Sequence, residues 1–202
     1  ETWAASQAAP MRRVHIKGDL SLWDPVAPNY DGAWSSGGFI VDSKVDGAIG
    51  SASQQQYLTR NVDMASWNGA NWNMVFVGDV NAPADSFPEP PYTNVAQTPI
   101  IREKPFLYVD GAGNYKVFRP ALRTNAQGVS WTSSYMGPGT SIPLSDFHIA
   151  IAGTDTTTTI NNALSQGKHI LFTPGIYHLD GTIQVNNANT VILGIGLPTL
   201  TP

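Results

Sequence analysis

The sequence predicts an all-β protein: a right-handed parallel β-helix (pectin-lyase-like) containing the last coils of one β-helix and the start of a second. First, the 202 residues include 19 Gly and 15 Pro but only 13% charged residues, which is typical of many short strands joined by turns. Second, strand-like segments recur about every 20 to 25 residues in the first third of the chain, a period found in repeat proteins. Third, a short helical pattern precedes a further group of short strands near the end of the chain.

The stretch 36–61 shows the coil pattern most clearly. Asp46-Gly47 forms a turn, small residues at 50–53 form another, and three glutamines follow. Because strand side chains alternate between faces, we expect Gln54, Gln56 and Leu58 to share one face. Three successive amides are unusual in a core strand. They suit either a surface that hydrogen-bonds hydroxyl groups or amides stacked on neighbouring coils.

We predict three segments. Residues 1–81 form the C-terminal coils of the first β-helix, and 82–145 form a Pro-rich connector that contains a β-hairpin around the turn at 110–114. Residues 146–202 form a capping helix and the first coils of the second β-helix. Thr154 or Asp155 is expected to cap this helix, which ends near Gly167. The strands expected after it are 169–172, 176–179, 182–185 and 191–193.

Composition excludes several function classes. The net charge of -4 gives no reason to expect nucleic acid or an anionic membrane as a partner. No apolar run approaches the length of a membrane span, and there are no cysteines. The four histidines are scattered on strands without metal-ligand spacing, so we expect them to be structural and predict no metal and no cofactor.

Both ends are expected to lie inside a longer protein. The first residues lead directly into strand-like sequence, and the apolar strand at 190–197 is followed by no closing element. A solenoid needs a cap to cover its last apolar cross-section. We therefore expect this chain to be a fragment of a longer protein. The missing C-terminal half of that protein is its expected partner.

Five segments together resemble bacterial members of glycoside hydrolase family 55: SGGFIVDSKVDG, SQQQYLTRN, WNMVFVGDVNAP, REKPFLYVDGAGNYKVF and GKHILFTPGIYHL. The resemblance spans nearly the whole chain, and the joint occurrence of the segments is more specific than any one of them. It implies two tandem β-helices with a substrate pocket in the cleft between them. It also implies a secreted, extracellular exo-β-1,3-glucanase that removes glucose from laminarin-type β-1,3-glucan with inversion.

The resemblance places the catalytic general acid, a glutamate, on the second β-helix late in the chain. The only glutamates here are Glu1, Glu89 and Glu103, and none matches that position. The 202-residue chain alone is therefore predicted to be inactive and to supply substrate-binding residues only.

Gln54 and Gln56 are assigned to binding sugar hydroxyls, with Gln54 also placing the catalytic water. Inverting hydrolysis needs one acid to protonate the leaving oxygen and a water on the opposite face. Carboxamides both donate and accept hydrogen bonds, so they suit vicinal hydroxyls without competing for the acid's proton. The alternative is an amide ladder that stabilises stacked coils.

Four further residues are candidate substrate contacts. Asp42 could bind hydroxyls, or hold calcium with Asp46, or be structural; Arg60 could line the cleft or pair on the surface. Trp34 and Trp67 lie in predicted loops and could stack on pyranose rings, whereas Trp72 begins a buried strand and is expected in the core.

Two other functions remain open. A non-catalytic β-helix could bind carbohydrate or act as an adhesin, and the missing acid favours it. A polysaccharide lyase would use calcium-binding carboxylates, a basic residue and an anionic substrate; 11 Lys+Arg in a net negative chain argue against it. Fold alone does not choose among these functions.

Overall fold

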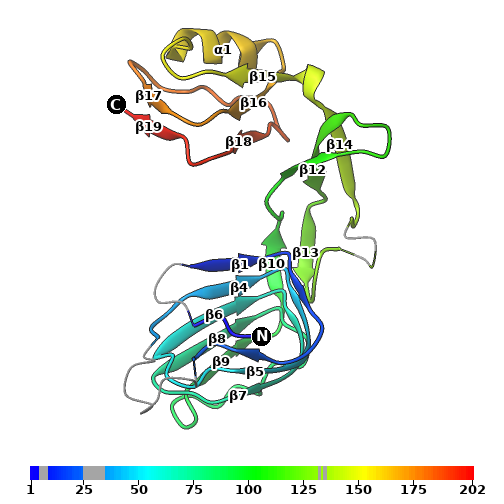
Figure 1. The fold of residues 1–202 in the computed structure, drawn as a ribbon, viewed down its shortest axis with the longest axis vertical. Helices are drawn as coiled ribbons and strands as arrows, with labels where there is room; N and C mark the ends of the chain where they lie inside the picture. Colours follow the sequence, from blue (N-terminus) through cyan, green and yellow to red (C-terminus); the bar gives the residue numbers. More distant parts are fainter. Residues whose placement is uncertain (5–8, 25–34, 132, 134–135) are drawn as a thin grey trace. The chain divides into compact units, whose positions relative to one another are not determined.

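The computed structural model describes residues 1–4, 9–24, 35–131, 133 and 136–202, and it is built mostly of short strands (Figure 1). The chain forms two compact units. One comprises 1–103 and 122–138, and the other comprises 104–121 and 139–202. The segment 82–145, predicted as a separate connector, contributes to both units.

The first unit is a parallel β-helix, as predicted. Its larger sheet has the strand order β1 (Pro10–Arg12), β4 (Phe39–Val41), β6 (Gln56–Arg60), β8 (Asn73–Val77) and β9 (Tyr92–Val95), all parallel. Its second sheet contains β2 (His15–Ile16), β3 (Leu20–Ser21), β5 (Lys44–Gly50) and β7 (Asp63–Asn68). The middle coils repeat after 17 to 19 residues, so the expected period of 20 to 25 was too long.

Four residues in left-handed backbone conformation mark the corner between the two sheets. Arg12, Val41, Arg60 and Val77 are register partners, and the next residue in each coil has a positive φ. These corner residues are Arg13 (φ 53), Asp42 (φ 49), Asn61 (φ 52) and Gly78 (φ 63). Asn and Gly adopt this conformation at low cost. At Gly78 a Cβ would lie 2.6 Å from the Ala126 carbonyl oxygen, so a side chain is also excluded sterically.

The interior of the first unit is a stack of large side chains from successive coils. Trp67 has its ring centroid 6.1 Å from that of Tyr57 and 5.1 Å from that of Phe76, and Phe76 is 5.8 Å from Tyr92. Tilted and edge-on ring pairs of this kind add to the free energy gained from burial. The cluster is completed by the buried side chains of Leu20, Leu22, Ile40, Val45, Ile49, Val62, Met64 and Met74.

Each unit also contains antiparallel strands. In the first unit β10 (Thr98–Ile101) pairs with β13 (Arg123–Ala126). In the second unit β11 (Phe106–Val109) and β12 (Tyr115–Pro120) form the predicted hairpin, and β14 (Gly139–Pro143) extends it. A 3-10 turn, η1 (Leu144–Asp146), leads into the last segment.

The second unit continues with a helix and parallel strands. Helix α1 (Thr157–Ser165) packs Ile160, Ala163 and Leu164 against the strand cluster beneath it. One sheet consists of β15 (Phe147–Ala150), β16 (His169–Phe172) and β18 (Ile192–Gly194), and the other of β17 (Ile176–His178) and β19 (Thr199–Thr201). In the part of the chain that the structure describes, no helix is long and apolar enough to span a membrane.

Two local predictions in this unit were wrong. Helix α1 is capped by Thr156, which forms a reciprocal capping box with Thr159, whereas Asp155 accepts hydrogen bonds from the Ile151 amide and the Thr159 hydroxyl. The strand expected at 182–185 does not form. The side chain of Asn161 instead donates to the Thr182 carbonyl (2.9 Å) and accepts from the Gln184 amide (2.7 Å), which ties this segment to the helix.

Candidate functional site

A groove lies on the outer face of the larger sheet in the first unit. Its volume is about 440 Å³, and its lining residues are Gly37, Gly38, Gln56, Tyr57, Leu58, Asn73 and Val75. Along β6 the exposed side chains of Gln56 and Leu58 alternate with the buried side chains of Tyr57 and Thr59. The strand period therefore places an amide and an aliphatic group together on the open face.

The strands of neighbouring coils place similar side chains beside Gln56 and Leu58. Gln56 pairs with Asn73, and Leu58 pairs with Phe39 on one side and Val75 on the other. Asn73 accepts a long hydrogen bond from the Thr93 hydroxyl (3.5 Å), which leaves its amide group as a donor. The groove thus offers a row of carboxamides beside an aliphatic strip. This combination matches a sugar ring, which presents hydroxyls at its edge and C–H groups on its faces.

Two glycines keep the groove open. Gly37 has φ +75 and Gly38 has φ +144, conformations that L side chains rarely adopt. A Cβ at Gly38 would lie 3.1 Å from the ring of Tyr57. The absence of a Cβ at Gly38 leaves room for the buried Tyr57 ring to pack against this segment.

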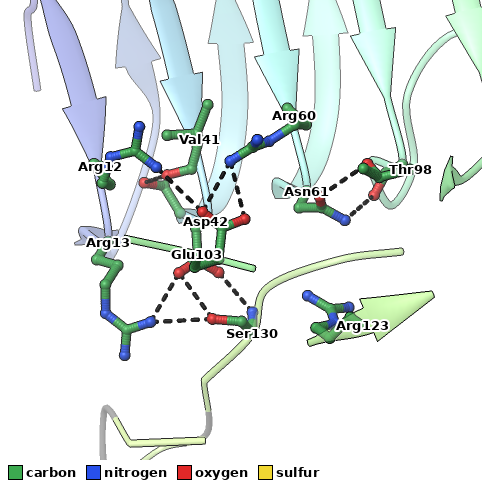
Figure 2. Close-up of polar contacts among 12 residues, drawn as sticks. Arg12, Arg13, Val41, Asp42, Arg60, Asn61, Thr98, Glu103, Arg123 and Ser130 are labelled. Atoms are coloured by element: carbon green, nitrogen blue, oxygen red, sulfur yellow. Dashed lines mark hydrogen bonds and ion pairs between the residues drawn. The ribbon is translucent and has the colours of Figure 1, made fainter. Parts of the chain in front are cut away.

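An ion-pair cluster lies on the same face, one row further along the strands (Figure 2). Glu103 accepts hydrogen bonds from Arg60 Nη2 at 3.0 and 2.8 Å and from Arg12 Nη1 at 3.1 Å. Arg12 and Arg60 are both register partners of Val41, so the carboxylate bridges across the strand between them. Burial raises the pKa of Glu103, while Arg60 and Arg12 oppose this shift.

A second buried carboxylate, Asp42, occupies the corner beside this cluster (Figure 2). Its oxygens accept from Arg13 Nη1 (2.8 Å), the Ser130 amide (2.6 Å) and the Ser130 hydroxyl (2.9 Å), and its carbonyl accepts from Trp131 Nε1 (2.7 Å). Asp42 has no exposed surface. These contacts fasten the segment around Ser130 to the corner of the β-helix.

Gln54 does not lie where the alternation of strand residues predicted. Strand β6 begins at Gln56, and Gln54 lies in the preceding turn with a fully buried side chain. Its Nε2 donates to the Leu22 carbonyl (2.9 Å) in the neighbouring coil. The assignment of Gln54 to water placement and sugar binding is therefore wrong in this geometry, and its role is structural. Gln56 does lie on the open face, where its predicted contact with sugar stays a prediction.

The other predicted site residues also divide into buried and exposed side chains. Asp42 and Trp67 are buried, with Trp67 Nε1 donating to the Gly69 carbonyl, so neither can contact a sugar as predicted. Arg60 lies on the outer face but is held by Glu103. Trp34 lies outside the described residues. Trp72, expected in the core, is 63% exposed because it lies in the turn before β8.

Sequence reasoning missed Asn73 and the pair of glycines. Asn73 is the register partner of Gln56 in the next coil. The sequence would reveal this pairing only if the exact length of the coil were known. The Gly37-Gly38 pair is visible in the sequence, but its steric relation to Tyr57 depends on the coil stacking.

Comparison with known proteins finds one family model and one curated relative that are similar to this chain. Residues 147–202 match the model of the LAM55 pectate lyase-like domain. Over 200 residues the chain is 54% identical to an exo-beta-1,3-glucanase of Streptomyces sp. (strain SirexAA-E / ActE), covering 99% of this chain and 32% of that protein. These matches bear out the resemblance to glycoside hydrolase family 55. The chain spans about a third of the length of the curated relative that it matches.

Solved structures of sacteLam55A from Streptomyces sp. SirexAA-E share the fold of this chain. The structure of sacteLam55A matches with a TM-score of 0.87 at 54% identity, over 98% of this chain and 35% of that chain. An ensemble refinement of a variant of sacteLam55A in which a glutamate is replaced by alanine, in complex with glucose, matches with a TM-score of 0.86 at 53% identity.

Proposed function

We propose that this chain is part of a secreted exo-β-1,3-glucanase that releases glucose from laminarin-type glucan with inversion of configuration. The observation that carries this proposal is the 54% identity to a Streptomyces exo-beta-1,3-glucanase over 99% of the chain. Identity at this level, with a TM-score of 0.87 to the structure of sacteLam55A from Streptomyces sp. SirexAA-E, supports a shared reaction as well as a shared fold.

Within this enzyme, the first unit supplies a glucan-binding surface. Gln56 and Asn73 present donors and acceptors to the hydroxyls of a neutral glucan, and Leu58 and Val75 contact the C–H faces of its rings. A groove without a free charge on its lining suits an uncharged polymer, because no desolvated ion is left unpaired when the sugar binds.

The general acid is supplied by a part of the enzyme outside this chain. Glu103 is held by two arginines in the first unit, Glu89 lies exposed between prolines, and Glu1 is the first residue. None of them faces the groove lining. The 202-residue chain alone is therefore expected to bind glucan without hydrolysing it.

The test is an assay of the full-length protein encoded with this segment, incubated with laminarin. Glucose is expected as the first and dominant product, and proton NMR of the fresh product is expected to show the α-anomer. Release of longer oligosaccharides would contradict an exo mode, and initial β-glucose would contradict inversion. No release from laminarin, with release from another polysaccharide, would overturn the proposal.

A further inference from the structure

Trp72 is an exposed tryptophan at one end of the groove. It directly precedes Asn73, the first residue of β8 and part of the groove lining, so it lies just beyond the row formed by Gln56 and Asn73. Its side chain is 63% exposed, whereas Trp67 and Trp131 are buried and donate their indole Nε1 to backbone carbonyls. A single exposed apolar side chain is common, but this one is large, aromatic and placed where the groove opens.

The turn that carries Trp72 is fixed to the preceding coil. The Trp72 amide donates to the Gln55 carbonyl (2.9 Å). The side-chain amide of Asn71 donates to the carbonyls of Ala52 (2.8 Å) and Gln54 (2.9 Å). Because these bonds hold the backbone while the indole stays open, a ligand that stacked on the ring would not have to order the turn.

Two carboxamides border Trp72, one in the chain and one in the neighbouring coil. Gln55 Oε1 accepts from the Ser36 hydroxyl (2.9 Å), which leaves the Gln55 NH2 group to donate. Asn71 uses its NH2 group within the turn, which leaves its Oδ1 to accept. An aromatic face with a donor and an acceptor beside it can contact both the C–H groups and the hydroxyls of a pyranose ring.

The opposite end of the groove is unfavourable for a neutral polymer. Beyond Leu58, the next outward side chain on β6 is that of Arg60, which shares Glu103 with Arg12. A sugar chain that continued in this direction would remove water from the ion pairs without replacing its hydrogen bonds. The end at Trp72, bordered by amides, is therefore the end at which a longer glucan leaves the groove.

We propose that Trp72 is the stacking platform of an additional glucosyl site, beyond the part of a β-1,3-glucan that Gln56 and Asn73 hold. The proposal rests on the proposed function, since it takes the same polymer as ligand. One face of a pyranose packs on the indole, and its hydroxyls meet Gln55 Nε2 and Asn71 Oδ1. The site makes the enzyme prefer glucans that are long enough to reach Trp72 over laminaribiose.

The experiment compares the KM values of the full-length protein encoded with this segment for laminarihexaose and laminaribiose, with glucose release as the readout. Laminaribiose has only the two units that flank the cleaved bond, so it does not reach Trp72. In Trp72→Ala the KM for laminarihexaose should rise about five- to ten-fold, while its kcat and the KM for laminaribiose stay unchanged. Trp72→Phe keeps a flat ring, so both KM values should stay within about two-fold of wild type. Tyr115→Ala, which removes another exposed aromatic side chain in the second unit, is the matched control and should change neither KM.

Two results would overturn the site at Trp72. An unchanged KM for laminarihexaose in Trp72→Ala would show that no sugar stacks on the indole. An equal rise in KM for both substrates would show that the substitution disturbs the groove or the fold instead. Glucose release by the wild-type enzyme tests the proposed function separately. Its absence would refute that function, whereas normal wild-type release with either of the two results above would refute only the site at Trp72.

Discussion

Gln56 on β6 and Asn73 on β8 are direct register partners, so their carboxamides lie side by side on the outer face of the first β-helix. Replacing Gln56 by alanine removes one of these amides from an exposed position and should not unfold the chain. We predict that Gln56→Ala raises the KM for laminarin of the full-length enzyme about five- to ten-fold, since one or two hydrogen bonds to sugar are lost. Gln184→Ala, at an exposed position in the second unit, should leave KM unchanged. Equal KM values for Gln56→Ala and wild type would remove Gln56 from the site.

Gly38 lines the groove and packs against the buried Tyr57 ring, so a side chain there should lower the stability of the chain. Gly38→Ala places a Cβ 3.1 Å from the Tyr57 ring at a φ of +144, which L residues rarely adopt. We predict a loss of about 1–3 kcal/mol in the free energy of unfolding, measured by urea denaturation. Gly50→Ala is the matched control, because a Cβ there would meet nothing within 4 Å and its φ is not positive. Equal losses in the two variants would contradict the steric account.

Glu103 is the central carboxylate of the ion-pair cluster. Glu103→Ala leaves the guanidinium groups of Arg12 and Arg60 without their shared partner on a partly buried face. We predict a loss of about 2–4 kcal/mol in the free energy of unfolding, measured by urea or thermal denaturation. Glu89→Ala, at an exposed position, should change it by less than about 0.5 kcal/mol. A Glu103→Ala protein as stable as wild type would show that the cluster contributes nothing to folding.

Asp79 makes stability depend on pH. Burial raises its pKa to about 7, although hydrogen bonds from the Thr59 hydroxyl and the Val62 amide oppose this shift. Because the folded pKa lies above the ordinary value of 3.8, the folded chain binds more protons than the unfolded chain between these values. Stability attributable to Asp79 is therefore fully present below about pH 4 and decreases as the pH rises towards about 7.

The matching variant is Asp79→Asn, whose amide does not titrate. We predict that the slope of unfolding free energy against pH between about 4 and 7 becomes less negative in this variant, by a total on the order of a few kcal/mol. Denaturant titrations at several pH values measure this slope. Parallel curves for the variant and wild type would show that Asp79 titrates normally in the folded protein.

Much of the fold could be predicted from the sequence because its signals are local. The turn at 110–114 with flanking aromatic strands specified the hairpin, and the apolar stripe of α1 specified a docked helix. The segment 182–185 was mispredicted because its backbone is satisfied by the side chain of Asn161, a contact between residues that are distant in sequence. Propensity does not report such contacts.

The site could be predicted only in part. The prediction that Gln56 lies on the open face was correct. Gln54 was wrongly assigned to the same face, because it precedes the strand, where the alternation of faces does not apply, and its side chain is buried. Asp42 was mistaken for a ligand-binding carboxylate because its partners, Arg13 and Ser130, lie 29 and 88 residues away in the chain. Asn73 joins Gln56 only through the spacing of the coils.

The central claim, that the groove of the first β-helix binds β-1,3-glucan, is tested most directly by a crystal structure of the protein soaked with laminaritriose. The account predicts a glucosyl unit in the groove, with its hydroxyls within hydrogen-bond distance of the Gln56 and Asn73 side chains and a ring face on Leu58 or Val75. An empty groove in crystals that hold the trisaccharide elsewhere would contradict it.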